Sequence, residues 1–277
     1  MSVFMNYEAA SRHYDETRVP VGLEIILGCL ARHAKPLESL TLLDAGCGTG
    51  AYAAAVSDHV GRIEALDMSP GMLSRARQRL GALVENGRAG FHQGSIAAMP
   101  LPERSVDAVM INQVVHHLGD HEDGRFASLR QVFAGIARVL RDDGLFVFNH
   151  CGQEQLRQGY WYHALIPEGA ARFRTRFAPL DLVEDLLRET GLTPKGRFVP
   201  LDAVCQGEAY FDGRGPLSEA WRDGDSCWSD ASAPELESAL RKVRDLARDG
   251  GLEAFVAQHD AARPQVGQIT IVSAQRA

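Results

Sequence analysis

The feature that most constrains the fold is a run of alternating glycines that follows an apolar segment and an acid. Residues 42–50 read Leu-Leu-Asp-Ala-Gly-Cys-Gly-Thr-Gly. Glycine has no Cβ, so a turn built from alternating glycines lets a ligand lie directly against the backbone. A helix-competent run begins at Ala51, and the first turn of a helix offers unpaired N–H groups. The pattern predicts a strand, a turn and a helix that together cradle a nucleotide or nucleoside.

Composition narrows the class of protein and of partner. The chain has 277 residues, of which 45% are hydrophobic, and a formal net charge of -7. It has no long basic run, which disfavours a nucleic-acid partner, and no apolar run near the ~20 residues that a membrane span needs. The five cysteines include no Cys-x-x-Cys pair, so neither a disulfide framework nor a metal site is indicated. We expect a cytoplasmic protein with reduced thiols and no bound metal.

Strand-like and helical patterns alternate through the first half of the chain. Apolar strand-like runs lie at 40–45, 62–68, 89–94, 106–112 and 145–150. Helical patterns separate most of them, and the helix predicted after the second strand begins at Ser69, a good N-cap, followed by Pro70. Near-continuous apolar strands that alternate with helices favour a parallel sheet covered on both faces. The predicted fold class is α/β, with a doubly wound and mostly parallel sheet.

The rhythm changes after residue 150. An aromatic stretch leads to a predicted helix near 180–189 and to strand candidates at 195–205 and 268–274. We expect a single domain over 1–277, built of a helical cap (1–35), a cofactor-binding core (36–150) and a substrate-side elaboration with the final strands (151–277).

Two acids indicate which nucleoside the glycine turn accepts. Asp67 ends the second predicted strand, about 20 residues after the turn, where a carboxylate accepts hydrogen bonds from ribose hydroxyls. Dinucleotide folds use the spacing G-x-G-x-x-G at a pyrophosphate, whereas this turn has G-x-G-x-G directly after Asp44. A carboxylate at that position would repel a pyrophosphate and would suit an ammonium group. S-adenosylmethionine carries both a ribose and an ammonium group, so it is the predicted cofactor, and a nicotinamide oxidoreductase is disfavoured.

At this point the sequence resembles a known family. Residues 44–50 and 66–73 are similar to motifs of the class I S-adenosylmethionine-dependent methyltransferases, and most similar to the small-molecule branch of ubiquinone/menaquinone-type, methyltransferase type 11-like enzymes. The likeness continues through 94–107 and 116–118 and covers about residues 7–150. It implies a Rossmann-like seven-stranded sheet with an antiparallel last strand, S-adenosylmethionine as cofactor, a small-molecule substrate, and a monomer or homodimer.

The resemblance also assigns cofactor-binding residues by their places in the matching motifs. Asp44 comes close to the amino group of the cofactor, and Asp67 takes its ribose hydroxyls. Tyr14 and Arg18 belong to a segment that in many relatives closes over the cofactor. The whole predicted set is Asp44, Gly46, Gly48, Gly50, Asp67, Met68, Ser95, Ile96, Asn112, Gln113, Tyr14 and Arg18.

Within this set the adenine and methionine ends of the cofactor have different partners. The resemblance places Met68, Ser95 and Ile96 beside adenine. It places the glycines and the pair Asn112 and Gln113 beside the methionine portion. Many relatives carry Asp where this chain has Ser95, which predicts a weaker contact with the adenine amine and a lower affinity for the cofactor.

Candidates for the chemistry follow the fourth and fifth strands, whose ends surround the crevice in this fold. Oxygen and nitrogen acceptors often need a base, and histidine titrates near neutrality. We therefore predict His150 and His117 as catalytic candidates, with a structural role for His117 as the alternative. Cys151, Tyr160 and Trp161 are predicted to line the substrate site, or else to belong to the core.

The predicted function is methyl transfer to a small molecule by in-line displacement, with the acceptor atom open among oxygen, nitrogen, sulfur and carbon. A first alternative is a thiol or metalloid methyltransferase of the arsenite type, suggested by three C-terminal cysteines: Cys151, Cys205 and Cys227. A second alternative is a regulator that binds S-adenosylmethionine without catalysis.

Overall fold

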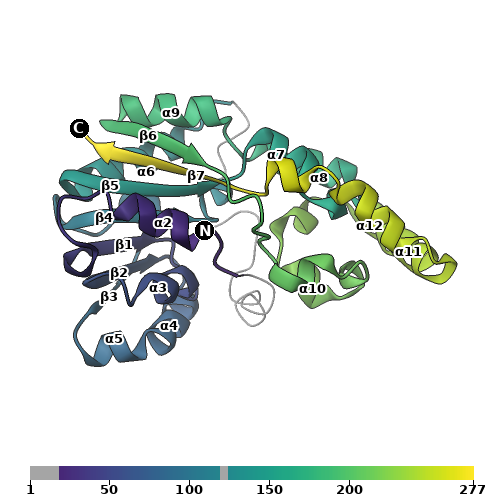
Figure 1. Ribbon diagram of the computed structural model, residues 1–277, viewed down its shortest axis with the longest axis horizontal. Helices are drawn as coiled ribbons and strands as arrows, with labels where there is room; N and C mark the ends of the chain where they lie inside the picture. Colours follow the sequence, from purple (N-terminus) through teal and green to yellow (C-terminus); the bar gives the residue numbers. More distant parts are fainter. Residues whose placement is uncertain (1–18, 119–123) are drawn as a thin grey trace.

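A seven-stranded sheet forms the centre of the computed structural model, which describes residues 19–118 and 124–277 (Figure 1). The strands are β1 (Thr41–Ala45), β2 (Arg62–Asp67), β3 (Ala89–Gln93), β4 (Val106–Asn112), β5 (Leu140–His150), β6 (Leu192–Phe198) and β7 (Thr270–Arg276). Their order is β3-β2-β1-β4-β5-β7-β6. The first five strands are parallel, and β7 runs antiparallel to both β5 and β6. The predicted fold class is confirmed.

Helices cover both faces of this sheet because successive side chains of a strand point to opposite sides. On β5, Leu145 and Val147 pack into one hydrophobic cluster, and Phe146 and Phe148 pack into the other. The first face is covered by α2 (Leu23–Leu30) and α3 (Ala51–Val56), and the opposite face by α6 (Ala127–Val139) and α9 (Leu180–Glu189). Figure 1 shows α2 in front of the sheet and α9 along its edge near β6.

The helix after β2 illustrates how local sequence sets these elements. In α4 (Pro70–Arg79), the Ser69 hydroxyl accepts a hydrogen bond from the Met72 N–H at 3.3 Å, and Pro70 occupies the first position. Met72 and Ala76 are buried along one stripe of the helix. Burying a side chain such as Met72 contributes about 1.5–3 kcal/mol to stability. The predicted cap and the buried stripe together therefore account for this helix. The short helix α5 (Gly81–Glu85) follows it.

Three strands differ from the predicted ones by two or more residues at an end. β5 begins at Leu140, because residues 141–144 form an irregularity in its pairing with β4 and Asp143 adopts a positive φ of 62°. Because this bulge contains acidic residues, the sequence pattern did not indicate where the strand begins. β6 begins at Leu192 and includes Pro194, which an edge strand tolerates because its N–H side has no neighbouring strand. β7 begins at Thr270 and ends at Arg276, slightly later than predicted.

Apart from α9, β6 and β7, the region after β5 lies beyond the C-terminal ends of the parallel strands (Figure 1). Its helices are α7 (Gln153–Gln158), α8 (Pro167–Thr175), α10 (Glu219–Asp223), α11 (Ala233–Asp249), α12 (Leu252–Asp260) and α13 (Arg263–Val266). Trp161, Tyr162 and Tyr210 are fully buried here and belong to the same cluster as Leu42 of β1. Within 19–118 and 124–277, none of the helices combines the length and apolarity needed to cross a membrane.

Candidate functional site

The three glycines of the turn between β1 and α3 all adopt left-handed backbone conformations. Their φ angles are 79° at Gly46, 54° at Gly48 and 79° at Gly50, values that favour glycine. A Cβ on Gly46 would lie 2.7 Å from the Val114 side chain, and one on Gly50 would lie 3.1 Å from Ala76. A Cβ on Gly48 would meet no described atom within 4 Å. The outer glycines thus allow close packing, and the middle one borders open space where a ligand can approach the backbone.

Asp67 holds this turn in place. Its Oδ2 accepts a hydrogen bond from the Gly48 N–H at 2.9 Å, and its Oδ1 accepts one from the Ser69 N–H at 2.8 Å. Burial raises the pKa of the Asp67 carboxyl, and the same backbone N–H groups oppose that rise. Each carboxylate oxygen has a second lone pair, so the group can still accept bonds from the two hydroxyls of a ribose.

Asp44 presents an unpaired carboxylate oxygen in the interior. The residue is 1% exposed, and its Oδ2 has no hydrogen-bond partner among the residues described. Burial, and after it the charge of Asp67, raises the pKa of the Asp44 carboxyl to about 7, whereas the Ala53 N–H acts in the opposite direction. A buried carboxylate is costly unless it is paired. A cationic group beside Asp44 would remove that cost.

Asn112 lies on the same face of the sheet, at the C-terminal end of β4. It is 7% exposed, and neither its Oδ1 nor its Nδ2 is hydrogen-bonded within the described part of the chain. An unsatisfied buried polar atom costs about 1–3 kcal/mol. Asp44 pairs in register with Met110, two residues before Asn112, so the carboxylate and the amide are neighbours along one edge. Together they offer what a zwitterion requires, an anionic acceptor and an amide donor.

The residues predicted to contact adenine are Ser95, Ile96 and Met68. The Ser95 hydroxyl accepts a hydrogen bond from the Ala97 N–H at 3.2 Å and caps the short helix η3 (Ile96–Ala98). Ile96 is buried and Met68 is exposed. Their contacts with adenine stay predictions. Tyr14 and Arg18 lie outside the described residues.

Two residues of the site were missed from the sequence, Asn149 and Tyr52. Asn149 is the register partner of Asn112 on β5, and it is 2% exposed. Its Oδ1 accepts a hydrogen bond from the Gln113 Nε2 at 3.1 Å, and its Nδ2 donates one to the Tyr52 hydroxyl at 3.2 Å. Strand alternation could have found Asn149, since it shares a face with Leu145 and Val147.

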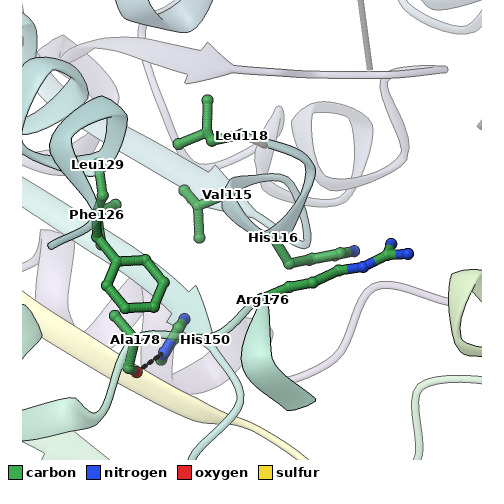
Figure 2. A pocket seen from close by; sticks show the side chains of 8 residues that line it. All are labelled: Val115, His116, Leu118, Phe126, Leu129, His150, Arg176 and Ala178. Carbon is green, nitrogen blue, oxygen red and sulfur yellow. Dashed lines mark hydrogen bonds between the residues drawn. The ribbon is translucent and has the colours of Figure 1, made fainter. Parts of the chain in front are cut away.

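The same alternation turns His150 to the opposite face. Its Nε2 is 2.7 Å from the Ala178 carbonyl, to which it donates, and its ring stacks on Phe148. Burial lowers the pKa of His150 to about 4, so the ring is neutral near pH 7. Figure 2 shows it in a small pocket at the end of β5. The pocket is lined by Val115, His116, Leu118, Phe126, Leu129, His150, Arg176 and Ala178. The structure therefore does not bring His150 together with Asp44 and Asn112.

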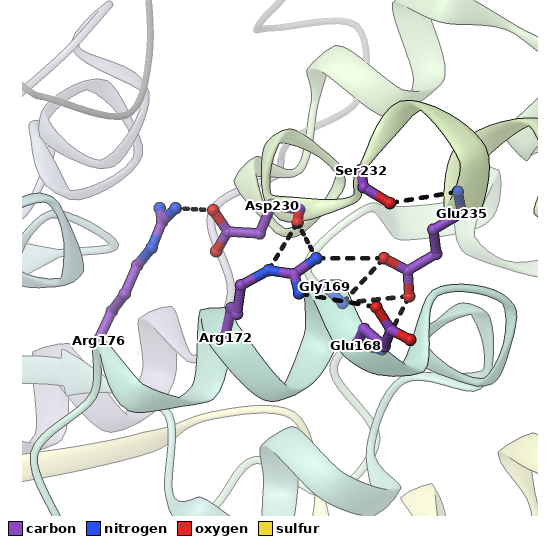
Figure 3. Close-up of polar contacts among 7 residues, drawn as sticks. All are labelled: Glu168, Gly169, Arg172, Arg176, Asp230, Ser232 and Glu235. Atoms are coloured by element: carbon purple, nitrogen blue, oxygen red, sulfur yellow. Dashed lines mark hydrogen bonds and ion pairs between the residues drawn. The ribbon is translucent and has the colours of Figure 1, made fainter.

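One wall of this pocket is fixed by a polar network from the C-terminal region (Figure 3). Arg176 forms an ion pair with Asp230, and Arg172 donates to the Asp230 carbonyl at 2.7 Å. Glu235, near the start of α11, accepts a hydrogen bond from the Gly169 N–H at 3.2 Å. These contacts tie α8 to the segments that follow it.

The remaining candidates lie in or near the C-terminal region. His117 is half-buried in the short helix η4 (Val115–His117). The Cys151 sulfur is 3.6 Å from the Tyr160 hydroxyl, which donates to the Gln268 carbonyl at 3.0 Å. Trp161 is fully buried, and its indole N–H donates to the Tyr210 carbonyl at 2.8 Å. Trp161 thus has no exposed surface to present to a ligand.

The strand order, the antiparallel β7 and the glycine turn between Asp44 and Asp67 are those of the Rossmann-like methyltransferase fold. Residues 43–148 match the family model described as "Methyltransferase domain". This match and the relatives described below support a class I S-adenosylmethionine-dependent methyltransferase of the small-molecule type. S-adenosylmethionine is the cofactor of this family.

Individual relatives agree with this assignment. The chain is 34% identical over 137 residues to a malonyl-[acyl-carrier protein] O-methyltransferase of Serratia marcescens, which covers 49% of this chain and 46% of the relative. For the first three curated relatives, the match spans less than half of their length.

Solved structures show the same fold over most of the chain. A putative methyltransferase of Anabaena variabilis superposes with a TM-score of 0.69 at 20% identity, covering 93% of this chain and 98% of that one. A geranyl diphosphate C-methyltransferase of Streptomyces coelicolor, solved with S-adenosyl-L-homocysteine, superposes with a TM-score of 0.55 at 16% identity, covering 92% and 78%.

Proposed function

We propose that this protein transfers a methyl group from S-adenosylmethionine to a small-molecule acceptor. The observation that supports this most directly is the pair formed by Asp44 and Asn112. A buried carboxylate oxygen and a buried amide, all without partners among the described residues, lie on one face of the sheet at the C-terminal ends of β1 and β4. When bound, the cofactor supplies an electrophilic methyl group on a sulfonium.

The residues of this chain bind and orient the methyl donor. Asp67 keeps the turn in its open shape and accepts from the ribose hydroxyls. The Asp44 carboxylate takes the ammonium group, and the Asn112 amide takes the neighbouring carboxylate. Gly48 lets the ligand lie at contact distance from the backbone. Alignment for in-line attack and exclusion of water are the main contributions that such a protein makes to the transfer.

We rank the metalloid alternative second. The three cysteines that suggested it, Cys151, Cys205 and Cys227, are all buried. Over 19–118 and 124–277, no three His, Cys, Asp or Glu side chains are grouped so that they could hold a metal ion. The names of the relatives include both an O-methyltransferase and a C-methyltransferase, and for this chain we propose the broader class of small-molecule acceptors.

Calorimetry with S-adenosylhomocysteine tests the donor half of the proposal. The full chain should bind it, and Asp67→Ala should weaken binding at least about tenfold, since a hydrogen bond to a charged group contributes about 1.5–3 kcal/mol. Asp58→Asn, at an exposed position, is the matched control and should bind normally. Absence of binding at millimolar ligand would contradict the proposal.

A transfer assay separates an enzyme from a regulator. The full chain is incubated with methyl-labelled S-adenosylmethionine and a panel of small molecules that carry hydroxyl, amine, thiol or activated carbon nucleophiles. Label recovered on any of them supports an enzyme. Tight cofactor binding without transfer to any class would favour the non-catalytic regulator.

A further inference from the structure

Gln113, directly after β4, has an unusual backbone conformation, and among the described residues its side chain is hydrogen-bonded only through Nε2. Its φ is 57°, in the left-handed region that residues other than glycine rarely adopt. Such conformations persist where the surrounding structure holds them, and they are common at functional sites. The side chain is anchored through Nε2, which donates to the Asn149 Oδ1 at 3.1 Å and to the Cys205 sulfur at 3.8 Å.

This anchoring leaves one end of the amide available. Both N–H groups of Gln113 are engaged, whereas its Oε1 makes no hydrogen bond to a described residue. Asn149 is itself held by Tyr52, to whose hydroxyl its Nδ2 donates at 3.2 Å. The Gln113 carbonyl is thus a fixed hydrogen-bond acceptor beside the face that carries Asn112 and Asp44.

A second amide next to Cys205 is also unsatisfied. Gln206 is 3% exposed, and neither its Oε1 nor its Nε2 has a partner in the part of the chain that the structure describes. The segment itself is well anchored, because the Cys205 N–H donates to the Gln268 side chain at 2.7 Å. A buried amide with two unpaired polar atoms is costly unless a ligand or water satisfies it.

We propose that Gln113 and Gln206 form the subsite for the methyl acceptor, an inference that rests on the proposed function. The polar groups next to the Gln113 side chain are amides, a phenol and a thiol. They suit an acceptor with a neutral hydrogen-bond donor, a hydroxyl or an amine, whose proton points at the Gln113 Oε1 and whose lone pair stays available. A carbon nucleophile has no such proton to offer.

The transfer balances without a redox partner. The acceptor oxygen or nitrogen forms a bond to the methyl carbon with its lone pair, and the carbon–sulfur bond breaks with its electron pair left on sulfur. The acceptor's proton then leaves to water, because an amide carbonyl is too weak a base to keep it. Gln113 is therefore a residue that contacts and orients the substrate.

Saturation-transfer NMR on the complex with S-adenosylhomocysteine tests this with two probes of similar shape, phenol and toluene. We expect a clear signal from phenol and a several-fold weaker one from toluene. In Gln113→Leu and in Gln206→Leu this preference should disappear. Gln206 lies outside the predicted cofactor-binding set, so Gln206→Leu should keep the affinity for S-adenosylhomocysteine within about twofold of the parent. Gln78→Leu, the same change on the exposed surface of α4, should keep the preference.

The outcomes separate this inference from the proposed function. If S-adenosylhomocysteine itself does not bind, the proposed function fails. If it binds but phenol and toluene give equal signals, or neither gives a signal, the subsite is wrong. If Gln113→Leu keeps the preference for phenol, or mainly weakens S-adenosylhomocysteine, then Gln113 does not orient the acceptor. Thermal unfolding of each variant checks that it is folded before the comparison is made.

Discussion

Asn112 and Asn149 are register partners on β4 and β5, yet their side chains are in opposite hydrogen-bonding states. Both amide atoms of Asn112 lack partners among the described residues. Both amide atoms of Asn149 are engaged, one by Gln113 and the other by Tyr52. Asn112 is thus left to bind a ligand, whereas Asn149 supports Gln113, the residue that follows Asn112. Under the proposed function, this division places the methyl donor beside Asn112 and the methyl acceptor beside Gln113.

Cofactor affinity should depend on pH through Asp44. The pKa of this buried carboxyl is raised to about 7, and only its ionised form pairs with an ammonium group. We expect the affinity for S-adenosylhomocysteine to fall as pH drops below 7, by up to about tenfold per pH unit. Calorimetry from pH 5.5 to 8.5 measures this. Asp44→Asn should bind weakly with a flatter profile, and Asp58→Asn should keep the slope; a flat profile in the parent would contradict the role.

Two glycines of the turn should respond differently to alanine. In Gly46→Ala the new Cβ meets Val114 at 2.7 Å, so the fold should lose several kcal/mol of stability. In Gly48→Ala the Cβ meets no described atom within 4 Å, so the fold should lose only about 1–2 kcal/mol through backbone strain. Gly48→Ala should nevertheless lose cofactor binding, because its methyl group occupies the ligand's space. Denaturant unfolding and calorimetry on both variants give the comparison, and normal binding by Gly48→Ala would refute this reading of the turn.

Ser95→Asp should strengthen cofactor binding without harming the fold. The Ser95 side chain caps η3 by accepting from the Ala97 N–H, and aspartate is an equally good cap. Its carboxylate adds a hydrogen bond to the adenine amine, so we expect a gain of about threefold to tenfold in affinity. S-inosylhomocysteine, which lacks that amine, is the control ligand and should show no gain. An equal change for both ligands would mean that Ser95 does not face adenine.

His150 should set acid stability rather than the pH dependence of catalysis. Burial holds its pKa at about 4 in the fold, below the ordinary value of 6.5, so the unfolded chain binds the proton more readily. Stability is then fully present above pH 6.5 and falls as pH drops toward 4, by about 3 kcal/mol in total. In His150→Phe the acid slope should be shallower, with a remainder from the buried His163, whose pKa is also lowered.

Urea unfolding at a series of pH values measures that slope. A methyl-transfer profile of the same variant between pH 6 and 8 should keep the shape of the parent. A profile that changes shape there would return His150 to the role of a catalytic base.

Much of the fold was predictable because it depends on local patterns. The strand predicted at 106–112 and the helix at 180–189 match β4 and α9, since apolar runs and caps act within a few residues. The start of β5 was not predictable, because its bulge places acidic residues inside a strand. The edge strand β6 was misplaced because Pro194 argues against a strand unless one side is known to be free.

The sequence by itself determined the donor side of this protein. Glycines with left-handed conformations and acids at strand ends are local properties. The family match and the fold agree with the cofactor that these glycines and acids predicted. The tertiary structure decided the rest. It placed Asn149 rather than His150 on the face of Asp44, because the face that a residue occupies depends on the register of the whole sheet. It also brought Cys205, 92 positions away in the sequence, to the Gln113 Nε2, so that the Gln113 side-chain carbonyl stays available. No local pattern encodes such a long-range contact.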